Sequence, residues 1–349
     1  MSDSTIPLTA ATETGHLAAS KVVVSAIAIL LAAIMLYFSL RGIQWEQVWR
    51  LISRANPAYL GAGASLVTTA LILRSLRWRV LLRARGEVGV ATAFWATCVG
   101  YFGNNFLPAR AGELARTLLI SSRSGMNSAY VLTTALMERM ADAIALVVIS
   151  AMALWALPAP PDWLAKASKP FGIAAVCGAL GIAILPRLGR FAHTVVHRMP
   201  LSPTLRDKLI GLLEHILEGL RSFHDASRLL TFLALTVVIW CVDATGTVVG
   251  AKALGVVIPL PVAFLLIAGL GLGSALPSTP GYVGIYQFVA VSVLVPFGLT
   301  HTEAIAYILF AQAVSYIVIG IWGSFGLIAY RRTAARGARE ELSTKAHDA

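Results

Sequence analysis

Charged residues are scarce in this chain. Of its 349 residues only 13% are Asp, Glu, Lys or Arg, whereas 57% are hydrophobic. A soluble globular domain carries about a quarter charged residues, so the composition excludes an ordinary soluble domain. The mean hydropathy of +0.76 agrees. The sequence therefore predicts an all-α polytopic membrane protein.

Cysteine is also rare, and the three cysteines, Cys98, Cys177 and Cys241, lie far apart in apolar segments. This spacing gives neither a disulfide framework nor a thiolate metal site. The sequence contains no G-x-x-x-x-G-K-[ST] loop, which excludes the usual ATPase phosphate site, and neither H-E-x-x-H nor G-x-S-x-G. We expect no cofactor, no metal and no catalytic residues, so an enzyme is the weaker hypothesis.

The net charge is strongly positive, +11 at pH 7. The Lys and Arg residues cluster between apolar segments. They do not follow one helix face with interleaved aromatic residues, the pattern typical of nucleic-acid binding. We therefore predict no nucleic-acid partner and expect the anionic surface of the inner leaflet to attract the basic loops.

Nine apolar segments are candidates for membrane helices, judged against about 20 residues for a span. They lie near 21–40, 57–73, 90–106, 128–157, 170–186, 229–251, 259–276, 283–299 and 303–329. Either all nine cross the membrane, or 90–121 and 258–299 are re-entrant hairpins. The hairpins place nineteen Lys and Arg inside, including five arginines of a presumed loop at 74–85, and six outside. The positive-inside rule favours this second topology.

The hairpin topology implies two inverted-topology repeats. Each half has two spans, a hairpin and a further span, which gives about six full spans plus two re-entrant hairpins, with both termini inside. The predicted organisation is a disordered tail (1–20), one membrane transport domain (21–330) made of repeat one (21–157) and repeat two (158–330), an amphipathic surface insert (187–228) and a basic disordered tail (331–349).

Each predicted hairpin contains the pattern L-P-x-x-x-G. It is LPARAG at 107–112 and LPSTPG at 276–281. Paired Pro and Gly interruptions in corresponding places of two halves point to the binding site of a transporter. The residues expected to shape the hairpins are Pro108, Gly112, Pro277, Pro280 and Gly281.

Charged residues inside these apolar segments are the main candidates for a site. Glu138 and Asp142 share one helix face, whereas Arg110, Glu113 and Arg116 follow at three-residue steps. We expect these charges, with Arg139, to pair between the first hairpin and the fourth apolar segment. Such pairs can fasten the hairpin into the bundle. Alternatively, Arg110 and Arg116 hold an anionic headgroup, because charges at this depth usually serve function.

The second half adds polar groups around its own interruption. Ser278, Thr279 and Tyr282 bring hydroxyls to a tip that either cradles phosphate or sugar, or is only a tight turn. Asp243 is a further intramembrane carboxylate, which Lys252 can neutralise. The candidate substrate-binding residues are Asn104, Asn105, Arg110, Glu113, Arg116, Glu138, Arg139, Asp142, Asp243, Ser278, Thr279 and Tyr282.

Three motifs carry a resemblance to a known family: GNNFLPARAGELAR, the E-R-x-x-D of residues 138–142, and LPSTPGYVGIYQ. From about 21 to 330 the chain resembles the flippase-like membrane domain of lysylphosphatidylglycerol synthases and their stand-alone relatives. The resemblance highlights Asn105, Pro108, Arg110, Gly112, Glu113, Glu138, Arg139, Asp142, Pro277, Pro280 and Gly281. Since the sequence ends at Ala349, we expect a stand-alone member without the synthase domain.

The resemblance implies a multi-pass protein of the bacterial inner (cytoplasmic) membrane that transfers a lipid between leaflets. Aminoacyl-phosphatidylglycerol, a hopanoid and a glycolipid are the substrate classes that it suggests. The favoured hypothesis is thus a lipid flippase or scramblase for a polar, anionic or phosphate-bearing lipid, either coupled to protons through Glu113, Glu138 and Asp142 or uncoupled. The alternative is a membrane enzyme or accessory subunit of headgroup modification, with Glu113 or Asp142 as general base. The sequence does not indicate an oligomeric state.

Overall fold

The computed structural model describes residues 32–107, 111–157, 225–274 and 280–347, together with residue 30 and scattered positions between 166 and 214; beyond residue 332 only the backbone is described. Every regular element in these residues is a helix. The predicted tail 1–20 and nearly all of the predicted insert 187–228 lie outside the described residues.

The first half of the chain forms five labelled helices. They are α2 (Trp45–Ser53), α3 (Pro57–Leu82), α4 (Val90–Phe106), α5 (Ala111–Ser124) and α6 (Ser128–Trp155). The two long helices begin at good caps: the side chains of Asn56 and Asn127 accept bonds from backbone N–H groups in the first turns of α3 and α6. Pro57 at the first position of α3 lacks an N–H that would be unpaired there anyway.

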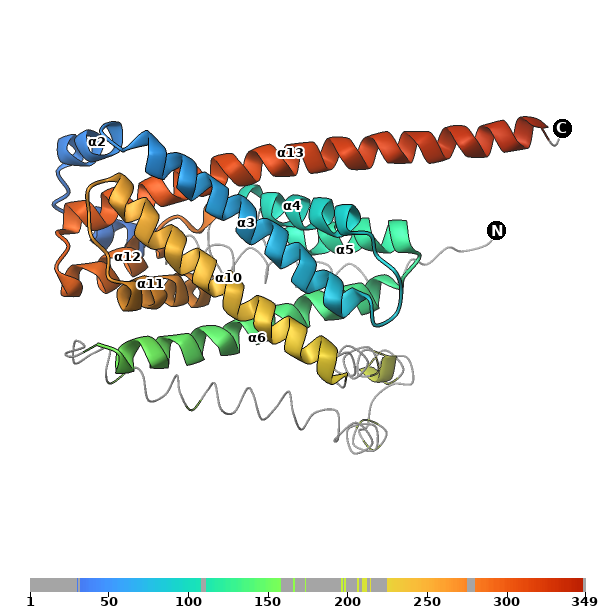
Figure 1. Ribbon diagram of the computed structural model, residues 1–349, viewed down its shortest axis with the longest axis horizontal. Coiled ribbons are helices and arrows are strands. Elements are labelled where there is room, and N and C mark those ends of the chain that lie inside the picture. The colour runs from blue at the N-terminus through green and yellow to red at the C-terminus, as the bar shows by residue number, and fades with distance from the viewer. Residues whose placement is uncertain are drawn as a thin grey trace, which may run out of the picture.

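The second half repeats this order of long, short, short and long helices (Figure 1). Its elements are α10 (Ala226–Ala253), α11 (Leu260–Gly273), the short η2 (Pro280–Tyr282), α12 (Ile285–Leu294), η3 (Val295–Phe297) and α13 (His301–His347). The chain breaks between α4 and α5 and between α11 and α12, at the two L-P-x-x-x-G motifs, as the sequence predicts.

Each broken pair forms a close helical hairpin. A Cβ on Gly112 of α5 would collide with the backbone oxygen of Gly100 in α4. In the second hairpin a Cβ on Gly273 of α11 would lie 3.0 Å from the side chain of Ile285 in α12. The two hairpins sit toward opposite ends of the bundle, and α3 and α10 run diagonally side by side across the front of the view (Figure 1).

The helix directions place the open ends of the hairpins on opposite sides. The amide of Asn56, before α3, donates to the carbonyl of Ala253, at the end of α10, and Arg77 near the other end of α3 contacts Thr236. The helices α3 and α10 are therefore antiparallel. Since α4 follows α3 and α11 follows α10, one hairpin starts from each end of the bundle.

Three helices are long and apolar enough to cross a membrane: Pro57–Leu82, Ala226–Ala253 and His301–Arg332. Shorter apolar helices cover Leu260–Gly273 and Ile285–Phe297. Helix α6 has 28 residues, long enough for a span, but carries Glu138, Arg139 and Asp142 near its middle. The predicted class of helical membrane protein is thus supported.

Three boundaries differ from the sequence prediction. Helix α3 runs to Leu82, so Arg74 and Arg77 are helical and not part of a loop; a span that starts at Pro57 needs about 20 residues and must pass beyond residue 73. Residues 226–228 are the first turn of α10 and not the end of a surface insert. Helix α13 continues to His347 through the predicted disordered tail, whose Ala, Arg and Glu residues are strong helix formers.

Candidate functional site

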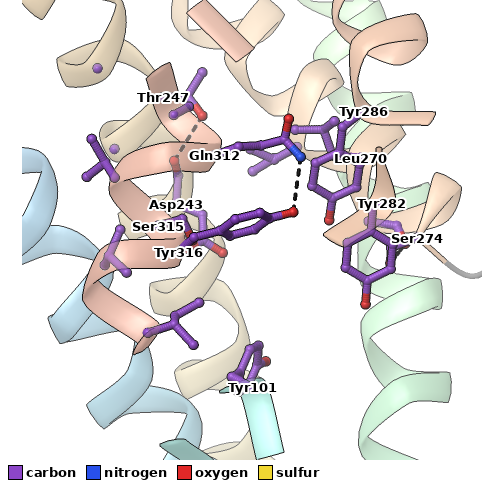
Figure 2. A pocket seen from close by; sticks show the side chains of 18 of the residues that line it. Tyr101, Asp243, Thr247, Leu270, Ser274, Tyr282, Tyr286, Gln312, Ser315 and Tyr316 are labelled. Atoms are coloured by element: carbon purple, nitrogen blue, oxygen red, sulfur yellow. Dashed lines mark hydrogen bonds between the residues drawn. The ribbon is translucent and has the colours of Figure 1, made fainter. Parts of the chain in front are cut away.

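A cavity of about 420 Å³, with charged and polar side chains set in a mainly apolar wall, lies where the two halves meet. Its walls come from α3, α4, α6, α10, α11 and α13, with Glu113 of α5, Tyr282 of η2 and Tyr286 of α12. Figure 2 shows Tyr316 and Gln312 of α13 projecting into this space opposite Tyr282 and Tyr286. The volume falls within the range of small-ligand pockets.

The tips of both hairpins reach Tyr316 at one end of this cavity. The Tyr316 hydroxyl donates to the carbonyl of Gly281, in the second tip. Its ring centroid lies 6.1 Å from that of Phe106, the last residue of α4 in the first hairpin. Gln312 Nε2 also donates to the Gly281 carbonyl, at 3.1 Å. One turn of α13 therefore fastens the two hairpins together.

The second tip has a backbone that explains its glycines. Gly281 and Gly284 have φ of 72° and 92°, and Tyr282 between them has φ of 59°. A left-handed conformation suits glycine and is uncommon for tyrosine. Tyr282 is thereby turned so that its ring stacks on Tyr286, with centroids 5.0 Å apart.

A network of buried ion pairs borders the cavity on the side of the first hairpin. Arg77 of α3 pairs with Asp142 at 2.6 Å and with Glu138 at 2.9 Å. Arg116 of α5 pairs with Glu138 at 3.0 Å, across the hairpin and α6. The predicted pairing between these two elements is therefore confirmed.

Three further pairs extend the network to the cavity wall. Arg139 of α6 pairs with Glu113 of α5 at 2.9 Å and approaches Asp142 at 3.6 Å. Glu113 also pairs with Arg116, at 2.6 Å. Three guanidinium groups and three carboxylates thus compensate one another, which offsets the cost of taking each charge out of water.

A separate ion pair joins the two halves. Arg74 of α3 binds Asp243 of α10, with the shorter contact at 2.6 Å. The Arg74 guanidinium lies 5.7 Å from the ring centroids of both Tyr101 and Trp240. Arg74, and not Lys252, is therefore the partner of Asp243, because the extension of α3 brings it to this depth.

Three residues of the cavity wall also carry buried polar atoms that lack a partner within the described part of the chain. They are Asn104 Oδ1, Asn105 Nδ2 and Trp240 Nε1. A buried polar group without a hydrogen bond costs free energy. These atoms are therefore suited to bind a ligand or water.

The structure places most of the predicted site residues around this cavity. Those that line it are Asn104, Asn105, Glu113, Arg139, Asp142, Asp243 and Tyr282. Arg116 and Glu138 are about 1% exposed and lie behind the wall, in the ion-pair network. Gly112 and Gly281 shape the two hairpins. For Pro280 only the backbone is described, and Pro108, Arg110, Pro277, Ser278 and Thr279 lie outside the described residues.

Sequence reasoning missed several residues of the site: Arg74, Arg77, Tyr101, Trp240, Tyr286, Gln312 and Tyr316. The minimum length of a span was a usable signal for Arg74 and Arg77, since a helix that begins at Pro57 must include them. The aromatic residues and Gln312 carry no such signal, because apolar helices contain many similar residues that only pack.

Comparisons with known proteins agree with this architecture. Residues 25–323 match the family model described as the lysylphosphatidylglycerol synthase TM region. The chain is also 25% identical to the protein named glycosyltransferase AglD of Haloferax volcanii, over 342 residues that include 87% of this chain and 54% of the relative. The chain thus spans about half the length of that curated relative. With a family match over most of its length, this chain belongs to the lysylphosphatidylglycerol synthase transmembrane-region family.

Proposed function

We propose that this protein is a lipid flippase or scramblase that moves a polar, anionic or phosphate-bearing lipid between the leaflets of the inner membrane. The observation that carries this proposal is the cavity, with charged and polar side chains in its wall, at the meeting point of two hairpins that start from opposite ends of the bundle. Cavities at the interface of inverted repeats, lined by interrupted helices, are typical substrate sites of transporters.

The lengths of the hairpin helices support a re-entrant arrangement. At about 1.5 Å per residue, the 17 residues of α4 and the 14 residues of α5 and of α11 each span less than the hydrocarbon core of about 30 Å. Each hairpin then enters from one face and returns to it. Because one starts from each end of the bundle, the two halves become inverted repeats, with both termini on the inner side.

The charge of the site supports a lipid with a polar headgroup. The described arginines of the site, Arg74, Arg77, Arg116 and Arg139, match four carboxylates, Glu113, Glu138, Asp142 and Asp243. In our proposal Arg110, in the motif between α4 and α5, adds a fifth guanidinium for an anionic headgroup. The headgroup crosses through the cavity while its acyl chains stay in lipid, so the charge avoids the hydrocarbon core.

Reconstituted vesicles test this function. Purified protein is placed in liposomes that contain a fluorescent lipid, and dithionite quenches the label in the outer leaflet only. We expect the wild type to make inner-leaflet label accessible faster than empty vesicles do, for phosphatidylglycerol, an aminoacylated phosphatidylglycerol or a glycolipid. Arg110→Ala should slow this exchange at least tenfold, whereas Arg50→Ala, in an exposed pair of α2, should not. Exchange no faster than in empty vesicles for every lipid class would refute the proposal.

A second candidate is supported by the name of the relative. AglD is named a glycosyltransferase, which favours a glycolipid as substrate or a role for this chain in headgroup modification. Mass spectrometry of lipids from a deletion strain separates the two functions. A missing lipid species supports an enzyme or its accessory subunit, whereas an unchanged inventory with altered leaflet distribution supports a flippase.

A further inference from the structure

One offset in sequence relates the first long helix and the L-P-x-x-x-G motif of one half to those of the other. Arg74 and Asp243, which bind each other, are 169 positions apart, and so are the first residues of α3 and α10 and the first residues of the two L-P-x-x-x-G motifs. Arg74 and Asp243 thus occupy the same position in equivalent helices. The ion pair therefore links equivalent positions of the two halves.

Equivalent positions of two antiparallel helices meet at the axis that relates them. The neighbouring contacts obey this symmetry. Applied to the contact of Arg77 with Thr236, the offset predicts a contact between residues 67 and 246, and a Cβ on Gly246 would lie 3.9 Å from the side chain of Leu66, one residue from the predicted position. The Arg74–Asp243 pair therefore lies at the pseudo-twofold axis between the halves.

This axial pair differs from the buried network beside it. The side chains of Arg74 and Asp243 are 14% and 22% exposed, and both line the cavity. Those of Arg77 and Glu138 are 0% and 1% exposed. A pair that only fastens two helices gains nothing from facing a cavity. The exposure of the axial pair leaves both of its members within reach of a ligand.

A hydrogen-bond donor next to Arg74 lacks an acceptor among the described residues. Trp240, whose ring contacts the Arg74 guanidinium, is 8% exposed and has no partner for its Nε1 donor in the described part of the chain. Elsewhere on the cavity wall the Asn105 donor Nδ2 and the Asn104 acceptor Oδ1 also lack partners among these residues. The unpaired Trp240 donor beside the guanidinium of Arg74 suits a ligand with more than one anionic oxygen.

We propose that Arg74 and Trp240 bind the anionic oxygens of a lipid headgroup, such as a phosphate, and that Asp243 holds Arg74 in place until the headgroup replaces it. The exchange breaks one ion pair and forms another, and Asp243 then faces the cavity, where water solvates it. An axial site keeps the same relation to both halves, so a headgroup reaches it from either leaflet. This inference rests on the proposed function and names the anion site within it.

Binding to the full chain in detergent tests the assignment. Calorimetry measures the affinity of the protein for three probes: dioctanoyl phosphatidylglycerol, uncharged dioctanoylglycerol and inorganic phosphate. We expect Arg74→Gln to weaken binding of the phosphatidylglycerol about tenfold or more, since a charge-assisted hydrogen bond is lost. Asp243→Asn should instead strengthen it, because the competing carboxylate is neutral. Trp240→Phe should weaken it severalfold, whereas Trp322→Phe, whose Nε1 binds Thr68 outside the cavity, should not.

The charge exchange Arg74→Asp with Asp243→Arg provides a folded comparison if a single variant is unstable, and it should bind nearly as the wild type does. Changes in the same direction for Arg74→Gln and Asp243→Asn would make the pair a structural clamp and overturn the assignment. Equal binding of dioctanoylglycerol would overturn it too, and equal binding of inorganic phosphate would make the site one for free anions. The vesicle assay tests the transport function separately. If the wild type binds the anionic lipid but does not move it between leaflets, the transport function is refuted and the anion site is not.

Discussion

The buried network of Arg77, Arg116, Glu138 and Asp142 is held together by mutual compensation. Each carboxylate in it faces at least two guanidinium groups, from α3, α5 or α6. Such a network contributes little net stability as a whole, but the loss of one member leaves a buried charge unpaired. The loss of one member therefore changes the stability of the fold more than the intact network contributes to it.

We predict that Arg77→Gln destabilises the protein strongly. Removal of one partner of a buried pair costs about 3–5 kcal/mol, and Arg77 neutralises both Glu138 and Asp142. Thermal unfolding in detergent measures the loss. Arg83→Gln is the matched control, because Arg83 and Glu87 form an exposed pair worth at most about 1 kcal/mol. Similar unfolding temperatures for both variants would mean that the network does not support the fold.

At the scale of elements, the sequence predicted the breaks of the hairpins and the ion pairs between the first hairpin and α6, but not the contacts of Arg74, Arg77 and Tyr316. The Pro and Gly residues of the two motifs marked the breaks between α4 and α5 and between α11 and α12, because both residue types interrupt helices. The length of α3 decides which arginines enter the membrane. Hydropathy alone ended this helix at residue 73 and so left Arg74 and Arg77 out of it. The contacts of Tyr316 with Gly281 and Phe106 were not predictable, because they depend on the tips of two hairpins from opposite halves meeting in space.

Close packing within the first hairpin leads to a second prediction. Gly112→Ala would drive a methyl group into the backbone of Gly100 and so push α5 away from α4. We expect a loss of about 1–3 kcal/mol from this overpacking, visible in thermal unfolding and in faster hydrogen exchange of α5. Gly61→Ala in α3 meets no atom within 4 Å and should be neutral or slightly stabilising. Equal behaviour of the two variants would argue against the hairpin contact.

The hydrogen bond between the Tyr316 hydroxyl and the second hairpin can be removed by deleting one oxygen atom. Tyr316→Phe removes the hydroxyl that donates to Gly281 and keeps the ring that faces Phe106. We expect hydrogen exchange to rise at residues 280–287, while exchange in α4 stays unchanged. Gln312 still donates to the Gly281 carbonyl, so the tip should loosen without unfolding. Tyr37→Phe, on an exposed ring outside the cavity, is the control. Unchanged exchange at residues 280–287 would show that the hydroxyl does not secure the tip.

At the scale of the whole molecule, the antiparallel crossing of α3 and α10 fixes the relation between the halves. The asymmetry of charge follows from it. The first half supplies the buried network of arginines and carboxylates, whereas the equivalent region of the second half supplies Tyr282, Tyr286, Tyr307 and Gln312 to the cavity. The cavity thus offers charged groups on one side and hydroxyl and amide groups on the other, which suits a ligand that carries both anionic and neutral oxygens.

The inverted arrangement makes a prediction about sidedness. Single cysteines at Glu87 and Ser122 flank the first hairpin, and single cysteines at Val257 and Thr300 flank the second; all four positions are exposed. In a background without the native cysteines, a membrane-impermeant maleimide should label the first two from one side of oriented membranes and the last two from the other. A first hairpin that crosses the membrane would instead place Glu87 and Ser122 on opposite sides. That result would remove the re-entrant loop and, with it, the route proposed for the headgroup, because the two tips could not meet between the leaflets.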